Sequence, residues 1–121
     1  MEGKGKKEWF IPDAYFPADD NGHTYISHEA VCVLNTGDQD ANIDITLYFE
    51  DAEPRCGFKA ECGARRTNHI RMDKIRDING KGVERGVPYA MLVTSDVPVV
   101  VQYSRCDTTQ SELAFMGLLA Y

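Results

Sequence analysis

A run of cationic side chains near the middle of the chain is the feature best suited to binding chemistry. Residues 64–71 read ARRTNHIR, and polar and apolar side chains alternate over residues 67–72. Such alternation is typical of a half-buried β-strand. The side chains predicted to share its exposed face are Arg65, Thr67, His69 and Arg71, with Arg66 beside them. Because a guanidinium can bind a carboxylate or phosphate through two parallel hydrogen bonds, the pattern predicts a site for an anion or an acidic partner segment. The alternative is that Asp or Glu side chains across the sheet, or at a subunit contact, neutralise the arginines.

The pair His28-Glu29 is a second candidate. It begins like the zinc-protease motif, but Cys32 stands where the second histidine would be. The surrounding residues also favour a strand, which would not place both ligands on one face. We therefore expect no zinc at this pair. We interpret both residues as a satisfied polar pair at a strand end and as candidate ligand- or partner-binding residues.

Other motifs argue against catalysis. The glycine-rich residues 80–86 resemble a dinucleotide-binding loop, but the last glycine comes one residue too late and no helical pattern follows. A flexible surface loop is the simpler interpretation. The four cysteines, Cys32, Cys56, Cys62 and Cys106, form no CxxC pair, so free, mostly buried thiols are expected. We predict a protein without enzymatic activity, metal or cofactor.

The elements that must position these residues are predicted to be strands. Residues 42–50 alternate strictly, and residues 30–34 form a short apolar run. Turn-forming residues 35–40 separate them and predict a hairpin. Residues 89–94 and 99–104 predict a second hairpin around residues 95–98, and residues 58–62 form a weaker strand. These patterns indicate an all-β, antiparallel sandwich or barrel with at least seven strands and no helix longer than about two turns.

The C-terminal segment fits two structures. Residues 107–110 resemble a capping box that would open a helix over residues 113–121. The segment is apolar on every side, however, and contains Gly117, so a strand covered partly by a second subunit fits equally well. Such a strand would invite aggregation unless a symmetric partner covered it. We therefore predict a homo-oligomer.

Length and charge limit the kinds of protein that this chain can be. The 121 residues suit one domain, which we place at residues 9–121 after a flexible basic tail at residues 1–8. No apolar run approaches the ~20 residues of a membrane-spanning helix, and no signal peptide is recognisable, so a cytoplasmic protein is expected. The net charge of −6 opposes binding to nucleic acid.

The sequence resembles the soluble sensory rhodopsin transducer family, small cytosolic proteins associated with cyanobacterial-type sensory rhodopsins. The residues that carry the likeness are Trp9, Ile11, Tyr15, Pro17, Ile26, Ser27, His28, Glu29, Val31, Cys32, Leu34, Asn35, Gly37, Asp38, Asp40, Ala41, Ile45, Thr46, Tyr48, Glu53, Pro54, Ala64, Arg65, Arg66, Thr67, His69, Arg71, Val97, Pro98, Val100, Val101, Gln102, Arg105, Asp107, Gln110, Ala120 and Tyr121. Residues 64–67 are the most distinctive block. The glycine-rich residues between Asp73 and Tyr89 depart from the family pattern.

The resemblance implies a jelly-roll-like sandwich similar to carbohydrate-binding modules, a homotetramer, and a signalling partner in the membrane such as a sensory rhodopsin. It also favours a strand at the C-terminus. The leading interpretation is a cytosolic signal-transducer-like protein that acts through protein–protein contacts. The alternative is a module that binds a sugar or an anionic metabolite, with Trp9, Tyr15, Phe16 and Tyr25 as the aromatic candidates for a sugar site.

Overall fold

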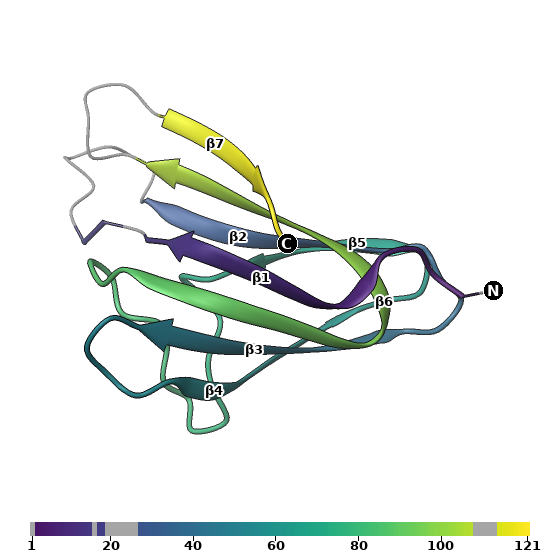
Figure 1. The fold of residues 1–121 in the computed structure, drawn as a ribbon, viewed down its shortest axis with the longest axis horizontal. Coiled ribbons are helices and arrows are strands. Elements are labelled where there is room, and N and C mark those ends of the chain that lie inside the picture. The colour runs from purple at the N-terminus through teal and green to yellow at the C-terminus, as the bar shows by residue number, and fades with distance from the viewer. Residues whose placement is uncertain (1, 16, 19–26, 108–113) are drawn as a thin grey trace.

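The computed structural model describes residues 2–15, 17–18, 27–107 and 114–121, and within these ranges it contains seven strands and no helix (Figure 1). The strands are β1 (Lys6–Ala14), β2 (His28–Asn35), β3 (Ala41–Phe49), β4 (Arg55–Cys62), β5 (Arg66–Arg71), β6 (Tyr89–Asp107) and β7 (Ala114–Leu119). The described ranges contain no helix, and so none that is long and apolar enough to cross a bilayer. The predicted all-β class is confirmed.

The strands form two antiparallel sheets that share β6. One sheet has the order β4-β3-β6-β1, and the other has the order β5-β2-β6-β7. Figure 1 shows β6 running along one sheet and then curving into the other. The predicted antiparallel β-sandwich is confirmed.

The bend of β6 overturns the second predicted hairpin. Residues 89–95 pair with β3 and residues 100–106 pair with β2, so the two segments belong to one strand. Asp96, Val97 and Pro98 have no partner in these ladders. A proline lacks the N–H that a ladder needs, so this unpaired step between the sheets can accept Pro98. The same residues had the chemistry of a turn, which explains the wrong prediction.

The first predicted hairpin is also wrong, because β2 pairs with β5 and β6, whereas β3 pairs with β4 and β6. The buried Asn35 holds the connection between them. Its side-chain nitrogen donates to the carbonyl oxygens of Gln39 and Cys62, and its side-chain oxygen accepts from the N–H of Gly37. This side chain satisfies backbone groups where the chain crosses between the sheets.

The core lies between the two sheets and follows the period of two. Ile43, Ile45 and Leu47 of β3 are fully buried, as are Val31 and Val33 of β2. The weakly predicted strand at residues 58–62 is longer than expected, because β4 begins at Arg55. Its Gly57 has a φ of +90°, at the shift in the register between β3 and β4. Glycine adopts this conformation at little cost, which allows a bulge here.

Two segments expected to be flexible contact the rest of the sandwich. Residues 6–8 belong to β1, so this strand begins inside the segment predicted as a tail over residues 1–8. In the glycine-rich connection between β5 and β6, Arg55 pairs with Asp77 at 2.9 Å and donates to the carbonyl oxygen of Gly82. The side chain of Asp77 also accepts from the backbone N–H of Asn79 and Lys81. These contacts join the loop to β4 and stabilise its turn.

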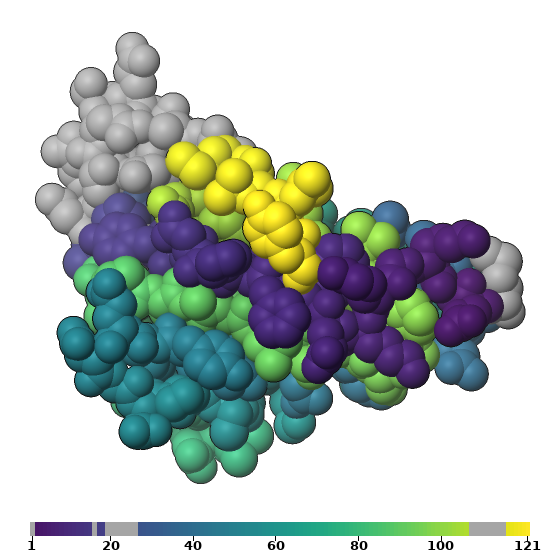
Figure 2. Space-filling view, viewed as in Figure 1, coloured from purple at the N-terminus to yellow at the C-terminus, as the bar shows by residue number. Residues whose placement is uncertain are grey.

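The C-terminal segment is a strand, which resolves the choice between helix and strand. β7 pairs with β6, and Tyr121 exchanges two backbone hydrogen bonds with Phe10 of β1. Figure 2 shows this segment on the surface beside β1. Leu119 and Tyr121 are 79% and 71% exposed, so apolar side chains remain uncovered here. Among the cysteines, Cys62 and Cys106 are buried, whereas Cys56 is exposed.

Candidate functional site

The strand β5 carries the predicted arginine cluster along the edge of one sheet. Thr67, His69 and Arg71 lie opposite Leu34, Cys32 and Ala30 of β2, and they alternate with buried Ile70, as the sequence pattern predicts. Arg65 lies outside the strand in a turn, with a φ of 54°. The prediction that Arg65 shares the strand face is therefore wrong, because the turn between β4 and β5 needs a left-handed residue there.

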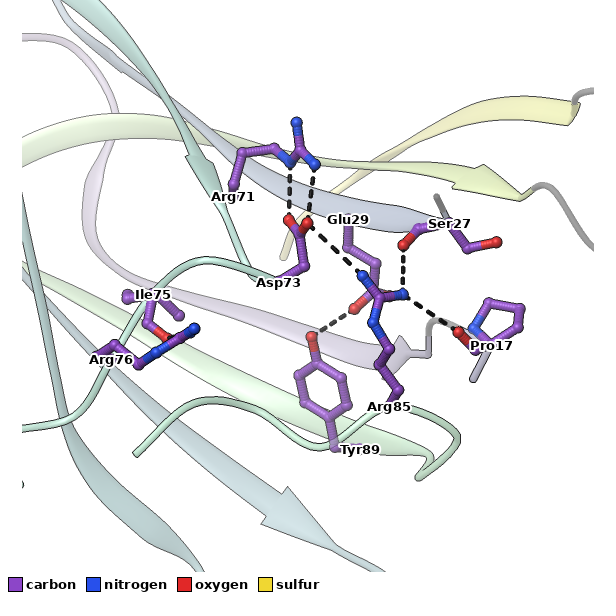
Figure 3. Close-up of polar contacts among 9 residues, drawn as sticks. All are labelled: Pro17, Ser27, Glu29, Arg71, Asp73, Ile75, Arg76, Arg85 and Tyr89. Atoms are coloured by element: carbon purple, nitrogen blue, oxygen red, sulfur yellow. Dashed lines mark hydrogen bonds and ion pairs between the residues drawn. The ribbon is translucent and has the colours of Figure 1, made fainter. Parts of the chain in front are cut away.

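Arg71 lies at the far end of β5 in a network of ion pairs (Figure 3). Its Nε and Nη2 atoms each donate to a carboxylate oxygen of Asp73 at 2.8 Å, and the Asp73 side chain is only 4% exposed. Arg85 approaches the same carboxylate at 3.7 Å and donates to the carbonyl oxygens of Ser27 and Pro17. This engagement supports the structural alternative for Arg71, in which a carboxylate neutralises the arginine.

The pKa values of the pair fit a strong interaction. Burial raises the pKa of Asp73, but the hydrogen bonds and the charge of Arg71 outweigh it, so the pKa lies below its ordinary value. The hydrogen bonds that Arg71 donates to Asp73 in turn raise the pKa of Arg71. A carboxylate with a lowered pKa stabilises the fold above its unfolded pKa and loses that contribution as the pH falls through its folded pKa. The pair therefore stabilises this end of the sandwich at neutral pH.

Glu29 forms a buried cluster close to the first network (Figure 3). Its carboxylate accepts a hydrogen bond from the hydroxyl of Tyr89 and another from the backbone N–H of Tyr15, both at 2.5 Å. Arg105 lies 3.7 Å from the same carboxylate and donates to the hydroxyl of Tyr103 at 3.0 Å. The prediction of a satisfied polar residue at a strand end is confirmed for Glu29, which is fully buried. His28, beside it, is half-buried.

The remaining predicted residues lie at the opposite end of β5. Arg65 is 74% exposed and lies 3.9 Å from the exposed Asp38. Arg66 and His69 are also exposed, and within the described residues neither has an ion pair. The structure thus divides the predicted set, with His28, Glu29 and Arg71 near one end and Arg65 and Arg66 at the other. Only the second group offers guanidinium groups with capacity for an external anion.

Other chemistry has less support in the geometry. Over the described ranges, no three His, Cys, Asp or Glu side chains gather so that they could hold a metal ion. Of the aromatic residues suggested for a sugar site, Trp9 donates its indole N–H to the carbonyl oxygens of Lys6 and Val99. Tyr15 is half-buried, and Phe16 and Tyr25 lie outside the described residues.

Comparison with known proteins assigns the chain to a family. A family model described as Anabaena sensory rhodopsin transducer matches residues 4–121. The chain belongs to this transducer family. The solved structure of the Anabaena sensory rhodopsin transducer is 36% identical, with a TM-score of 0.76, over 85% of this chain and 99% of that chain. The crystal structure of Thermotoga maritima 1070 is also 36% identical, with a TM-score of 0.85, over 98% of this chain and 95% of that chain. No curated protein matches the chain.

Sequence reasoning missed several polar residues of this transducer-family chain. Asp73, Arg85, Tyr89, Tyr103 and Arg105 complete the two networks, yet only Arg105 lay among the residues of the family likeness, and there it had no assigned role. The signal that pointed to the networks was Glu29 itself, a carboxylate directly before an apolar run. A charged residue in a buried strand needs partners, because burying an unpaired charge is costly.

The buried carboxylate predicts a pH dependence for this transducer-family chain. Burial raises the pKa of Glu29 above its ordinary value of 4.5, although Tyr89, Tyr15 and Arg105 oppose the shift. The folded state then holds the proton more tightly than the unfolded state does. The contribution of this group is fully present below pH 4.5 and is lost as the pH rises through the folded pKa.

We expect a Glu29→Gln variant to reveal this dependence. The free energy of unfolding of the unsubstituted protein should fall relative to that of the variant as the pH rises from 4 upward, by at most about 1.4 kcal/mol per pH unit. Urea titrations over a series of pH values measure the difference, and contributions from other groups cancel. If the unsubstituted protein instead gains stability relative to Glu29→Gln as the pH rises, the pKa of Glu29 is lowered in the folded state.

Proposed function

We propose that this protein is a non-enzymatic signal transducer of the cytoplasm that works by binding other proteins. The match of residues 4–121 to the transducer family carries the proposal. The relative named the Anabaena sensory rhodopsin transducer is similar over nearly its whole length. By this likeness, the partner of our chain is a membrane photoreceptor of the sensory rhodopsin type or another signalling protein. The protein acts as a homo-oligomer, for which we propose a tetramer.

The exposed start of β5 is the proposed partner contact. Arg65 and Arg66 place two exposed guanidinium groups here, on a protein whose net charge is −6, and the exposed His69 lies three residues further along. Exposed arginines at the rim of an interface attract an acidic partner toward it, and this attraction weakens as the salt concentration rises. Thr67 lies between Arg66 and His69, with its hydroxyl donating to the carbonyl oxygen of Val33. We therefore assign an acidic segment of the partner to this surface.

A double charge reversal tests the contact. We expect Arg65→Glu/Arg66→Glu to weaken binding to Anabaena sensory rhodopsin in nanodiscs about tenfold or more, because like charges then face each other. Biolayer interferometry at two salt concentrations measures the affinity. Lys74→Glu/Arg76→Glu is the matched control, since both residues are exposed and the net charge changes equally. Equal losses in both variants would contradict a local contact, and no binding by the unsubstituted protein would contradict this partner.

The same groups supply the observation that favours a second function, the binding of a small anion. Exposed guanidinium groups such as that of Arg66, and that of Arg65 with its long contact to Asp38, can bind a phosphate or carboxylate ligand as well as a protein segment. A thermal-shift titration with inorganic phosphate and citrate separates the two functions. Stabilisation that disappears in Arg65→Glu/Arg66→Glu would favour the small-ligand module.

A further inference from the structure

Two adjoining clefts form one groove where β3 ends and β6 begins, which we call the β3–β6 groove. The first cleft has a volume of about 390 Å³ and lies between the turn after β3 and residues 81–88 of the connection before β6. The second, of about 310 Å³, extends across the ends of β3 and β6 to Pro12 of β1. Both clefts are lined by Phe49, Glu50 and Pro88, so they are continuous.

The walls of the β3–β6 groove are largely apolar. Tyr48 is 43% exposed and Phe49 is half-buried, and the other apolar lining residues are Pro12, Ala52, Val87, Pro88 and Ala90. Arg55 also reaches the groove, but its guanidinium pairs with Asp77 at 2.9 Å and donates to a carbonyl oxygen of the β5–β6 connection. These bonds hold the connection against β4, so that it forms one wall of the groove.

Carboxylates outnumber cations along the rim of the groove. The acidic lining residues are Asp13, Glu50, Asp51, Glu53 and Glu84, and all of them are exposed. Within the described ranges, the side chains of the three on the β3–β4 turn form no hydrogen bond or ion pair. The lining cations are the paired Arg55 and Lys81, which lies 3.9 Å from Glu84. The groove therefore combines apolar walls with an unbalanced negative charge.

We propose that the β3–β6 groove binds an extended segment of a partner protein in which lysine or arginine alternates with apolar residues. Successive side chains of an extended segment point in opposite directions. The apolar ones can then face half-buried Phe49 and Val87, while the basic ones reach the exposed carboxylates. Lysine and arginine also have apolar stems that pack on such walls, and the exposed ring of Tyr48 can bind a cation on its face.

The charge and the shape of the groove exclude two simpler occupants. An acidic segment would be repelled by the rim. A metal ion would need a compact set of ligands, and over the described part of the chain no three His, Cys, Asp or Glu side chains gather closely enough to hold one. A basic and partly apolar segment is complementary to both the rim and the walls.

The inference rests on the proposed role in binding other proteins and adds a second contact surface of opposite charge. The groove lies at the end of β3, whereas Cys62, just before the turn that contains Arg65, pairs with Ala41 at the start of β3. The two surfaces are therefore at opposite ends of this strand, and variants of one leave the other unchanged.

Peptide binding measured by fluorescence polarisation tests the groove. The probe is a short fluorescein-labelled peptide of alternating arginine and leucine. We expect Glu50→Lys/Glu53→Lys to weaken its binding about tenfold or more, because like charges then face each other. Glu8→Lys/Glu61→Lys is the matched control, since both residues are exposed in β1 and β4 outside the groove and the net charge changes equally. This control should keep most of the affinity, and circular dichroism establishes that both variants are folded.

Each outcome supports or overturns the groove. A loss confined to Glu50→Lys/Glu53→Lys supports it, whereas equal losses in both variants show that the probe responds to net charge alone. A peptide of alternating arginine and serine should bind more weakly than the arginine–leucine probe, and equal affinities would overturn the role of the apolar walls. If the unsubstituted protein binds no probe, the groove is wrong, but the proposed function stands as long as the protein binds the rhodopsin nanodiscs.

Hydrogen exchange on the unsubstituted protein locates the bound peptide without any substitution. We expect the arginine–leucine probe to slow exchange at residues 50–54 and 81–88, which form the two sides of the groove. Exchange at residues 64–67, beside the other proposed contact, should not change. Slowed exchange at residues 64–67 without any change at the groove would overturn the proposal.

Discussion

Replacing Glu29 by alanine is expected to lower the free energy of unfolding by about 3 to 5 kcal/mol at pH 7. The side chain is fully buried, and its removal takes the acceptor from the hydroxyl of Tyr89, the shorter of two acceptors from the N–H of Tyr15, and the nearer carboxylate from Arg105. Removing one partner from a buried polar network costs far more than the pair itself contributes. Urea titration measures the loss, which should also lower the melting temperature by about 10 °C or more.

A matched surface substitution controls for the loss of a carboxylate. Glu53 is exposed, so Glu53→Ala should change the free energy of unfolding by no more than about 0.5 kcal/mol. Equal stability of Glu29→Ala and Glu53→Ala would show that the Glu29 cluster does not support the fold. Its close contacts would then need a functional explanation.

The two ends of the arginine cluster are expected to respond differently to mutation. Arg71→Ala should lower the free energy of unfolding by about 2 kcal/mol, because the nearly buried carboxylate of Asp73 loses its bidentate partner and keeps the longer contact from Arg85. Arg65→Ala should have almost no effect, since its side chain is 74% exposed and its ion pair with Asp38 is long. Thermal and urea unfolding of the two variants measure the contrast.

A conservative substitution refines the test. Arg71→Lys keeps the charge but loses the two parallel hydrogen bonds, so its stability should lie between those of the alanine variant and the unsubstituted protein. If Arg71→Ala keeps its full stability and loses partner binding, Arg71 belongs to the partner contact and not to the scaffold.

Local patterns were sufficient to predict the strands but not their partners. The alternation over residues 42–50 and 67–72 identified β3 and β5, because a strand with one buried face alternates polar and apolar residues whichever strand it pairs with. Both hairpin predictions failed, because pairing depends on which sheet a strand joins. The turn chemistry at residues 35–40 and 95–98 marks places where the chain passes between sheets, and a tight hairpin would need the same residue types.

The residue types predicted a cationic site at residues 65–71, whereas the structure places its arginines at the two ends of β5. The sequence placed Arg65, Arg66 and Arg71 in one segment, but it could not show that the carboxylate of Asp73, two residues beyond the strand, binds Arg71. The bidentate contact requires Asp73 to turn back after the strand ends, which depends on backbone bonds such as that from the N–H of Ile75 to the carbonyl oxygen of Arg71. Such turns carry little signal in a single sequence.

The sharing of β6 by both sheets has a consequence for synthesis. When a ribosome has made residues 1–88, five of the seven strands exist, yet only β3 with β4 and β2 with β5 have their partners. About 75 residues separate the end of β1 from the start of β6, so at 5–20 residues per second β1 has no partner strand for roughly 4–15 s. During that time its apolar Trp9 and Ile11 lack the surface that later covers them. The nascent chain therefore cannot complete either sheet early, and both close in one late step that needs contacts distant in sequence.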